Sequence, residues 1–504
     1  MGFLRLVVKR WLVSDVQICI ILFLMPTMKL QGGYNINIQG RPGPTIKKMP
    51  EPEILYLRQK SRRFHFTKLR VEDGRSISCG QPLAVDPENY NVPLLAPRTG
   101  TVRLNQLDGH IVLEDIQPLE KETAVFKQPE HISIHPGHLS LKHKLLFDLG
   151  AWQFFSDAFT GSLPDPMGNP QAVIISTLSL EPFLARGDIQ LDEKLLNFTR
   201  GLEQLQSLLE YQPMYLIMPK IDTELATKVH EHIRGYAWVE MIEIPLRYPF
   251  DNFTILARYL GLKPGKGPVW SLRAEGIIAV DSALTMHKPC IQKIISIGGP
   301  AVLKPAHFEV CAGYPLDDLL KGLIADEPVR ILDGGVMTGE IIGDNDYGLD
   351  TECNGLTVLR EHRQREFLAF LRPGFDRRSY SSCFLSTFRK AFPERLNTAL
   401  RGELRPCISC NYCEEVCPAG IMPHLIHKYL YADLLDEAED ARIDLCIECG
   451  LCSFVCPSKI DLKREFVEAK RVIQEEKEEI LKEQRQQEEL QRTIKGEQAK
   501  DIIE

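Results

Sequence analysis

Eight of the 14 cysteines in this sequence lie in two short runs that share one spacing. The runs read CISCNYCEEVCP (residues 407–418) and CIECGLCSFVCP (residues 446–457), and both follow the pattern C-x2-C-x2-C-x3-C-P. This spacing is typical of bacterial ferredoxin domains, in which cysteine thiolates hold 4Fe-4S clusters. The sequence therefore predicts iron–sulfur chemistry, which is the transfer of single electrons.

In domains with this motif, the fourth cysteine of each run binds the cluster of the other run. We therefore predict two crossed ligand sets. The first set is Cys407, Cys410, Cys413 and Cys456, and the second is Cys446, Cys449, Cys452 and Cys417. Structural zinc is the alternative, although zinc usually binds separated C-x2-C pairs rather than two complete repeats that end in Cys-Pro. Adjacent clusters favour electron transport over a purely structural role.

The segment between the two runs, IMPHLIHKYLYADLLDEAEDARID, is long and helix-prone. It predicts an α-helical 4Fe-4S dicluster domain over residues 399–465 rather than a compact form with two hairpins. The last residues, 466–504, are highly charged with few apolar positions. They predict a charged helical tail that is solvated or contacts a partner rather than a core element.

Length, charge and cysteine distribution limit the domain number, the partners and the compartment expected for the chain. A length of 504 residues predicts several domains, and a formal net charge of −8 argues against nucleic acid as the main partner. Tight cysteine clusters in a long chain indicate metal in a reducing compartment, so we expect the working parts in the cytoplasm. Residues 1–27 are either an apolar leader or the product of a mis-assigned start, with Met28 as the favoured true start.

The remaining domains are predicted from patterns of short apolar runs. Residues 28–125 contain short glycine-punctuated strands that resemble a barrel-sandwich hybrid, but the hairpin segment DPENYN lacks the lysine of a biotinyl or lipoyl carrier. Residues 126–265 alternate buried strands with helices, which predicts a Rossmann-like α/β domain. GKGPVW (residues 265–270) fails as a nucleotide loop, because Trp270 replaces the third glycine of G-x-G-x-x-G.

Residues 266–360, including VWSLRAEGIIAVDSAL, are interpreted as strand-rich, which predicts a small β-grasp-like domain; a linker follows over residues 361–398. The fold class is thus multidomain α/β and β with a helical ferredoxin domain. Isolated cysteines such as Cys290 and Cys311 are expected to be buried small hydrophobic residues. The histidines of HISIHPGHLSLKH (residues 131–143) lack regular spacing, so we expect no metal there.

Four segments together resemble a known family. They are INIQGRPGP near the start, LGAWQFFSDAFTGSLPDP (149–166), VWSLRAEGIIAVDSALTMHKPCIQKIISIGGPAVLKP (269–305) and REFLAFLRPGFDRRSYSS (365–382). Residues 34–386 are similar to NqrA, one of the subunits of the Na+-translocating NADH:quinone reductase, Nqr. Residues 400–460 resemble the dicluster domain of RnfC, a component of the related Rnf complex. Typical NqrA lacks the clusters, so the chain looks like a hybrid.

The resemblance implies an oxidoreductase component on the cytoplasmic face of the inner membrane, bound peripherally to integral-membrane subunits of an ion-translocating, sodium-transporting type of complex. It would relay electrons through two 4Fe-4S clusters between a soluble donor or acceptor and membrane flavin or quinone sites. FMN and NAD are not expected on this chain, because the GGAGFP loop of typical RnfC is absent. Quinone remains a candidate ligand without assigned residues. We assign no catalytic residue, because electron transfer requires no general base or nucleophile.

Two rival functions remain open. The chain could be the iron–sulfur subunit of a soluble or membrane-associated dehydrogenase that feeds quinone, which would share the helical dicluster but would not need the Nqr-like front. It could also be a non-enzymatic scaffold whose clusters only brace the fold.

Overall fold

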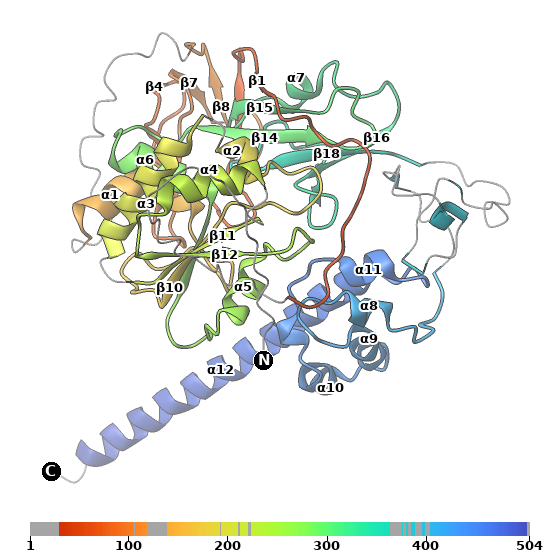
Figure 1. Ribbon diagram of the computed structural model, residues 1–504. Coiled ribbons are helices and arrows are strands. Elements are labelled where there is room, and N and C mark those ends of the chain that lie inside the picture. The colour runs from red at the N-terminus through yellow and green to blue at the C-terminus, as the bar shows by residue number, and fades with distance from the viewer. Residues whose placement is uncertain are drawn as a thin grey trace, which may run out of the picture.

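The computed structural model describes residues 30–500 except for 105, 119–138, 192, 210–211, 220–222 and most of 363–403, where only 375, 380–381, 385–388 and 396–398 are described. The predicted leader, the first histidines of the 131–143 segment and most of the predicted linker lie outside these residues. Three β-containing units form the body of the molecule, and a small helical domain lies beside them with a long helix projecting away (Figure 1).

The N-terminal unit consists of two antiparallel sheets that share one core. The first has the order β2-β8-β7-β4 and the second β3-β5-β6. Their strands are β2 (Leu55–Arg58), β3 (Lys68–Leu69), β4 (Ser76–Ile77), β5 (Pro82–Asp86), β6 (Val92–Leu95), β7 (Gly100–Arg103) and β8 (His110–Glu114). Leu55 and Leu57 alternate with outward residues and are fully buried, as expected for a strand with one face on a core. This is the predicted barrel-sandwich architecture.

The second unit is a parallel sheet of the order β12-β11-β10-β13, with the short β9 added antiparallel at the edge. Its strands are β9 (Ser156–Asp157), β10 (Ala172–Ser176), β11 (Met214–Met218), β12 (Val239–Glu243) and β13 (Val269–Arg273). Its helices are α1 (Leu141–Asp148), α2 (Gly187–Gln190), α3 (Leu195–Leu209), α4 (Glu224–Ile233), α5 (Phe253–Tyr259) and α6 (Ala274–Leu284). This strand order is that of a doubly wound fold.

Alternate residues of the central strand β10 serve two cores. Val173 and Ile175 face α3 and α6, whereas Ile174 faces the core that includes α5. Both faces of the sheet are therefore covered, which explains why β10 is a continuous apolar run rather than an alternating one. The Rossmann-like prediction is confirmed at the level of the α/β fold.

The interpretation of residues 274–284 as strand was wrong. AEGIIAVDSAL forms α6, in which Ala274, Ile277, Val280 and Ala283 recur at helical spacing and are fully buried. The preceding strand β13 pairs with β10, so the sheet continues past the boundary predicted at residue 265. A buried helix with apolar residues on most faces lacks the polar stripe that would reveal its period.

The third unit is a six-stranded mixed sheet of the order β1-β15-β14-β18-β16-β17 with one short helix. Its elements are β1 (Ile46–Lys48), β14 (Gln292–Gly298), β15 (Ala306–Cys311), α7 (Leu316–Leu320), β16 (Val329–Asp333), β17 (Glu340–Ile341) and β18 (Gly355–Arg360). β1 pairs in parallel with β15 although more than 250 residues separate them in sequence. The N-terminal segment, residues 30–48, thus precedes the first unit in sequence but ends as a strand of the third unit's sheet.

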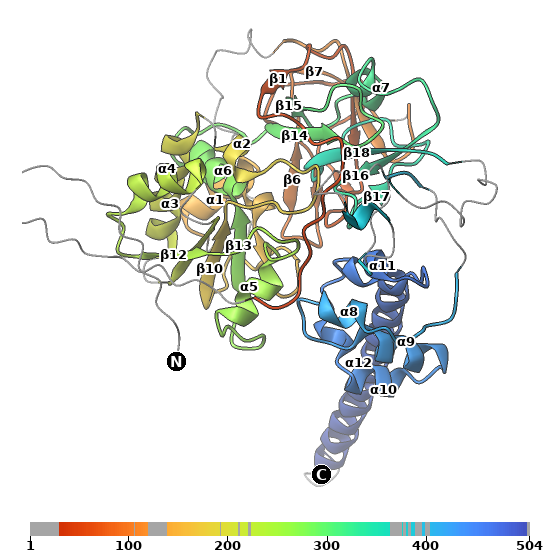
Figure 2. The same ribbon diagram turned by 45° about the vertical axis from the view of Figure 1, so that its right-hand side comes forward.

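The C-terminal domain is helical, as predicted. It contains α8 (Tyr412–Glu415), α9 (Pro423–Tyr431), α10 (Leu435–Asp440), a 3-10 turn η5 (Ile443–Leu445), α11 (Leu451–Val455) and α12 (Leu462–Lys500). The start of α12 belongs to the domain core, because Phe466 is fully buried against Ile426 and Ile443. The expectation that residues from 466 onward form no core element was therefore wrong for the first turns. Farther along, residues 481–487 are exposed and the helix projects from the body (Figure 2).

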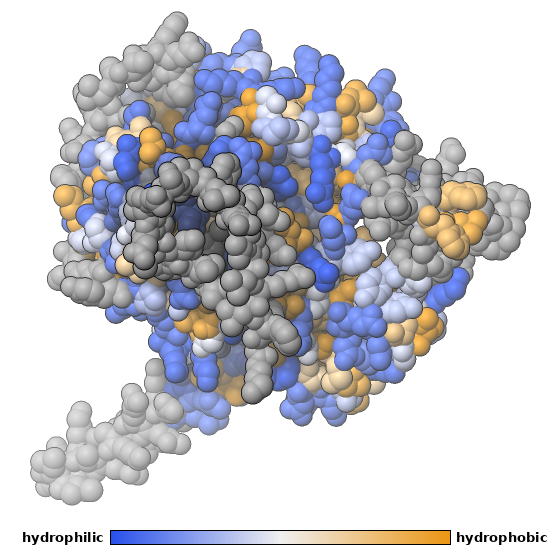
Figure 3. All heavy atoms as spheres, in the orientation of Figure 1, coloured by the Kyte–Doolittle hydropathy of each residue, from blue (hydrophilic) through white to orange (hydrophobic). Residues whose placement is uncertain are grey.

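The surface mixes polar and apolar side chains over the face seen in Figure 3. Among the described residues, no helix combines the length and the apolar character needed to cross a membrane.

The aromatic cluster of the second unit provides a test of the fold. Trp152 is fully buried, stacks on Phe147 and Phe155, and meets Trp270 edge-on at a ring-centroid distance of 5.2 Å. We expect Trp152→Ala to lower the free energy of unfolding by about 3–5 kcal/mol, because the cavity cannot close fully. Urea denaturation followed by circular dichroism measures this. The control Leu196→Ala, on an α3 side chain that is 67% exposed, should change stability by less than about 0.5 kcal/mol.

Candidate iron–sulfur site

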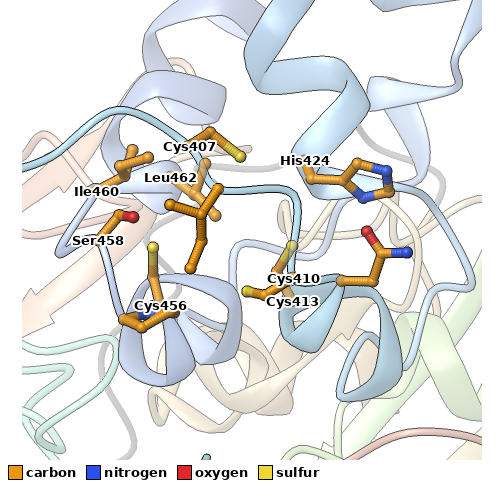
Figure 4. Close-up of a pocket in the computed structure, with 11 residues that line it drawn as sticks. Cys407, Cys410, Cys413, His424, Cys456, Ser458, Ile460 and Leu462 are labelled. Carbon is orange, nitrogen blue, oxygen red and sulfur yellow. The ribbon is translucent and has the colours of Figure 1, made fainter.

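The eight clustered cysteines line two pockets, and each pocket contains cysteines from both runs. The first pocket is lined by Cys407, Cys410, Cys413 and Cys456 (Figure 4). The second is lined by Cys417, Cys446, Cys449 and Cys452 and also by Cys413, which lines both pockets. Apart from this shared cysteine, the groupings are compatible with the two crossed sets predicted from the spacing.

The two runs adopt the same local backbone, which explains how one spacing produces two matching pockets. Ser409 and Asn411 in the first run have φ of 54° and 63°, and Glu448 and Gly450, at the equivalent positions, have φ of 57° and 76°. Left-handed backbone at such positions turns successive N–H groups toward one concave side. The short helices α8 and α11 begin directly after these turns and present the third cysteine of each run.

Burial and backbone amides act on the thiols in opposite directions. Burial raises the pKa of Cys413 to about 11 and that of Cys449 to about 12. Amides such as those of His424 for Cys413, Leu451 for Cys449, and Ser453 for Cys452 act to lower the pKa. Glu448 also donates its N–H to the Cys446 sulfur at 3.4 Å. A buried thiolate at these positions therefore has backbone N–H donors beside it. It also requires a nearby positive charge to offset its burial, and a bound metal supplies that charge.

The donor set fits an iron–sulfur group. Thiolate sulfurs are the ligands that such clusters use, and amides directed at sulfur are one of the means by which proteins tune them. None of the eight clustered cysteines is joined in a disulfide. Among the described residues, no three His, Cys, Asp or Glu side chains converge closely enough to hold a single metal ion.

The first pocket lies near the surface of the C-terminal domain. Ile408, between two of its cysteines, is 65% exposed, and nearby Leu404 is also exposed. His424 lines the pocket, with its Nδ1 atom 3.6 Å from a carboxylate oxygen of Glu414. This pocket therefore has an edge that a second molecule can approach.

The second pocket instead faces the body of the molecule. The Tyr248 hydroxyl donates to the Cys449 carbonyl at 2.7 Å, and the Arg258 guanidinium donates to the Leu445 carbonyl at 2.9 Å. Burial beside these groups raises the pKa of the Tyr248 phenol strongly, so the hydroxyl stays protonated and remains a donor. The α/β unit thus contributes side chains to the surroundings of the second pocket.

An apolar cluster and two further contacts hold the helical domain in this place. Ile36 and Ile38 from the N-terminal segment pack with Val416, Leu451 and Val455 of the helical domain. The Gly33 amide donates to the Val416 carbonyl at 2.9 Å. From the third unit, the Met337 carbonyl accepts from the Lys463 ammonium at 2.9 Å.

Sequence patterns did not reveal Tyr248, Arg258 or the N-terminal segment. Tyr248 lies in RYPF and Arg258 in LARY, and neither string matches a motif. Both side chains contact the helical domain, whose residues lie about 190–200 positions away in sequence. INIQG belongs to a segment that resembles NqrA, but the resemblance does not indicate that Ile36 and Ile38 lie at the junction with the helical domain. Only tertiary contacts reveal these positions.

The remaining residues singled out from the sequence lie away from the two pockets. Arg273, which the sequence did not single out, lies at the carboxyl end of β13, where doubly wound sheets bind ligands; it pairs with Asp251 at 3.2 Å and also donates to the Leu178 carbonyl. GKGPVW leads into β13, as expected. Cys311 is buried, as expected, whereas Cys290 is only half-buried. Burial raises the pKa of the Cys311 thiol to about 11 and that of the Cys290 thiol to about 12, so both thiols stay protonated near neutral pH. His143 lies on α1, where its ring contacts the Ser140 hydroxyl.

The N-terminal contact yields a prediction. A Cβ on Gly32 would lie 2.6 Å from the Cys417 carbonyl oxygen, and its φ is +69°. We expect Gly32→Ala to displace this segment and to speed hydrogen exchange of the Gly33 amide, measured by mass spectrometry. Gly109→Ala is the control, because Gly109 has a φ of +72° but open space around its Cβ position. Equal acceleration at Gly33 in both variants would contradict the contact.

Family comparisons agree with the division into units. Residues 28–107 match the NqrA N-terminal barrel-sandwich hybrid domain, residues 140–286 the NqrA second alpha/beta domain, residues 294–343 the NQRA C-terminal domain, and residues 406–460 the 4Fe-4S dicluster domain. The second match includes α6 and supports a boundary after it rather than at residue 265.

Curated relatives of the chain are NqrA subunits of Na(+)-translocating NADH-quinone reductases. Those of Psychromonas ingrahamii and Marinomonas sp. are both 24% identical and align with 81% and 82% of this chain and with 90% and 91% of their own length. That of Neisseria meningitidis serogroup C is 24% identical over 82% of this chain and 91% of its own length.

Among solved structures, the chain has weak likeness to NAD+-reducing [NiFe]-hydrogenase. The air-oxidized form is 14% identical over 44% of this chain and 47% of that one, with a TM-score of 0.34. The H2-reduced form is 12% identical over 78% and 73%, with a TM-score of 0.37. These values support no conclusion about activity. The family matches show that the chain contains the N-terminal, second and C-terminal domains of the NqrA family, followed by a 4Fe-4S dicluster domain.

Proposed function

We propose that this chain is a peripheral electron-transfer subunit of an Nqr- or Rnf-like ion-translocating redox complex. It relays electrons through two 4Fe-4S clusters toward or from flavin or quinone sites on membrane subunits. The observation that carries the proposal is the crossed grouping of cysteines, in which Cys456 joins the first pocket and Cys417 joins the second. Adjacent clusters of this kind suit electrons that pass one at a time.

The chain's own residues perform three tasks in this role. The eight cysteines hold the clusters, with Cys407, Cys410, Cys413 and Cys456 in one set and Cys446, Cys449, Cys452 and Cys417 in the other. Backbone amides donate to the thiolate sulfurs, and the apolar side chains of Ile421, Ile460 and Phe466 exclude water. When bound, the clusters supply reversible one-electron chemistry, which the polypeptide alone lacks.

The NqrA-type units supply the connection to a larger assembly. The relatives are named as one subunit of a reductase that translocates Na+ and uses NADH and quinone. By analogy, the body of this chain docks on integral-membrane partner subunits at the cytoplasmic face of the membrane. The exposed edge of the first pocket at Ile408 favours a second contact there with a soluble electron donor or acceptor.

Cysteine variants test the ligand sets. We expect Cys410→Ala and Cys449→Ala each to remove about half of the bound iron, because each cluster loses one of its four thiolates. Iron and sulfide analysis of the anaerobically purified chain, with EPR of the reduced form, measures this. Cys290→Ala is the matched control, since Cys290 lies outside both pockets, and it should keep all of the iron. Unchanged iron in Cys410→Ala, or zinc in place of iron in the wild type, would refute the assignment.

Redox behaviour tests the relay role. We expect the isolated chain to hold about eight irons, to be reduced reversibly by dithionite, and to show no response to NADH because it carries no flavin. Absorbance and EPR during anaerobic titration report each step. Clusters that cannot be reduced without loss of the fold would favour a structural scaffold. Bound FMN, or reduction by NADH alone, would make the chain an input module instead.

A further inference from the structure

The second pocket is surrounded by charges that come from two different domains. From the helical domain, the Lys470 ammonium donates to the Cys446 carbonyl at 3.1 Å and pairs with Glu448. Arg442 pairs with Asp444 at 2.9 Å. Arg258 is different, because it comes from α5 of the α/β unit and reaches the Leu445 carbonyl, directly before Cys446 in sequence.

The pairing of these charges decides which of them acts on the pocket. The Glu448 and Asp444 carboxylates each have a cation of their own, and Arg442 and Asp444 are both more than half exposed, so water screens that pair. Among the described residues, no carboxylate lies within ion-pair distance of Arg258, although the Asp444 carboxylate is near enough to attract its guanidinium and is the charge that acts on it most strongly. The guanidinium is partly buried, and it also interacts electrostatically with Arg442 and with the Cys446 and Cys417 sulfurs.

We propose that Arg258 is a positioning residue that raises the reduction potential of the cluster held by Cys446, Cys449, Cys452 and Cys417. This inference rests on the proposed function. Reduction adds one electron, and hence one negative charge, to a group already surrounded by thiolates. A fixed positive charge in a medium of low dielectric constant stabilises that form more than the oxidised one.

Through Arg258, the contact between the α/β unit and the helical domain affects the reduction potential of the second cluster. The guanidinium belongs to the α/β unit, whereas all eight cysteines belong to the helical domain. The potential of the second cluster therefore depends on the helical domain remaining docked on the body. No side chain of the α/β unit lines either pocket, but the hydrogen bonds from Tyr248 and Arg258 go to backbone carbonyls beside the second pocket, whereas the first borders solvent at Ile408.

The test is an EPR-monitored potentiometric titration of the full chain with dithionite as reductant. The signal that remains in Cys410→Ala and disappears in Cys449→Ala identifies the second cluster. We expect Arg258→Gln to reduce the equilibrium constant for reduction of that cluster about tenfold, which is a shift of about 59 mV to lower potential for one electron. The potential of the first cluster should not change, and Arg258→Lys should keep the second cluster close to its wild-type potential because it retains the positive charge.

Two controls separate charge from docking. Arg442→Gln removes an exposed cation from the same region and should shift the potential much less. Tyr248→Phe removes an interdomain hydrogen bond to Cys449 without a change in charge and should leave the potential near the wild-type value. Equal shifts in Arg258→Gln and either control, or no shift in Arg258→Gln, would overturn the inference. If Arg258→Gln does not assemble both clusters, Arg258→Met replaces it, and the same shift of the second-cluster potential is expected.

The wild type separates this inference from the proposed function. If wild-type clusters are reduced reversibly and Arg258→Gln behaves like wild type, only the inference fails. If the wild-type chain binds no iron or cannot be reduced reversibly, the proposed function fails.

Discussion

The crossing of the two cysteine runs is the constraint on which the C-terminal domain depends. Cys456 lies in the pocket of the first run and Cys417 in that of the second, so neither pocket can form until α9 and α10 bring the runs together. The flanking helices α8 and α11 have only four and five residues, too few for stability in isolation. A small core around Ile426 and Phe466 and the groups held by the thiolates must provide the rest.

A second constraint is that the pockets cannot be equivalent, although their backbones match. The first borders solvent, whereas the second faces the body and is contacted by Tyr248 and Arg258. Local sequence symmetry produces two similar cradles, and the tertiary arrangement then gives them different surroundings. Since burial, hydrogen bonds and nearby charge set the potential of an iron–sulfur cluster, clusters held in these two pockets would differ in reduction potential although the cysteine spacing is the same.

The helical domain is docked through segments from each of the three other units. The N-terminal segment contributes Ile36 and Ile38, the α/β unit contributes Tyr248, and the third unit contributes the Met337 carbonyl for Lys463. The loop that contains Met337 is in turn held by Glu181, whose carboxylate accepts from the Met337 and Thr338 amides at 2.8 and 2.7 Å. The NqrA-type units thus form a continuous support for the added dicluster domain.

The sequence by itself determined the features that depend on local pattern. The C-x2-C-x2-C-x3-C-P runs indicated iron–sulfur chemistry and predicted the two ligand sets, because ligand spacing is set by the wrapping of a few residues around one group. The alternation of short apolar runs with helices indicated the α/β unit, and glycine-punctuated strands indicated the N-terminal sandwich. Each of these signals lies within a few tens of residues.

Only the tertiary structure decided the features that depend on distant partners. The nature of AEGIIAVDSAL as α6 was hidden because a helix covered by α3 and a sheet needs few polar positions. The place of β1 in the third sheet and of Phe466 in the ferredoxin core follows from contacts that no periodicity records. Arg258 and Gly32 match no motif at all. Their importance comes from where α5 and the N-terminal segment meet the second pocket, and long-range packing rather than local sequence fixes that meeting point.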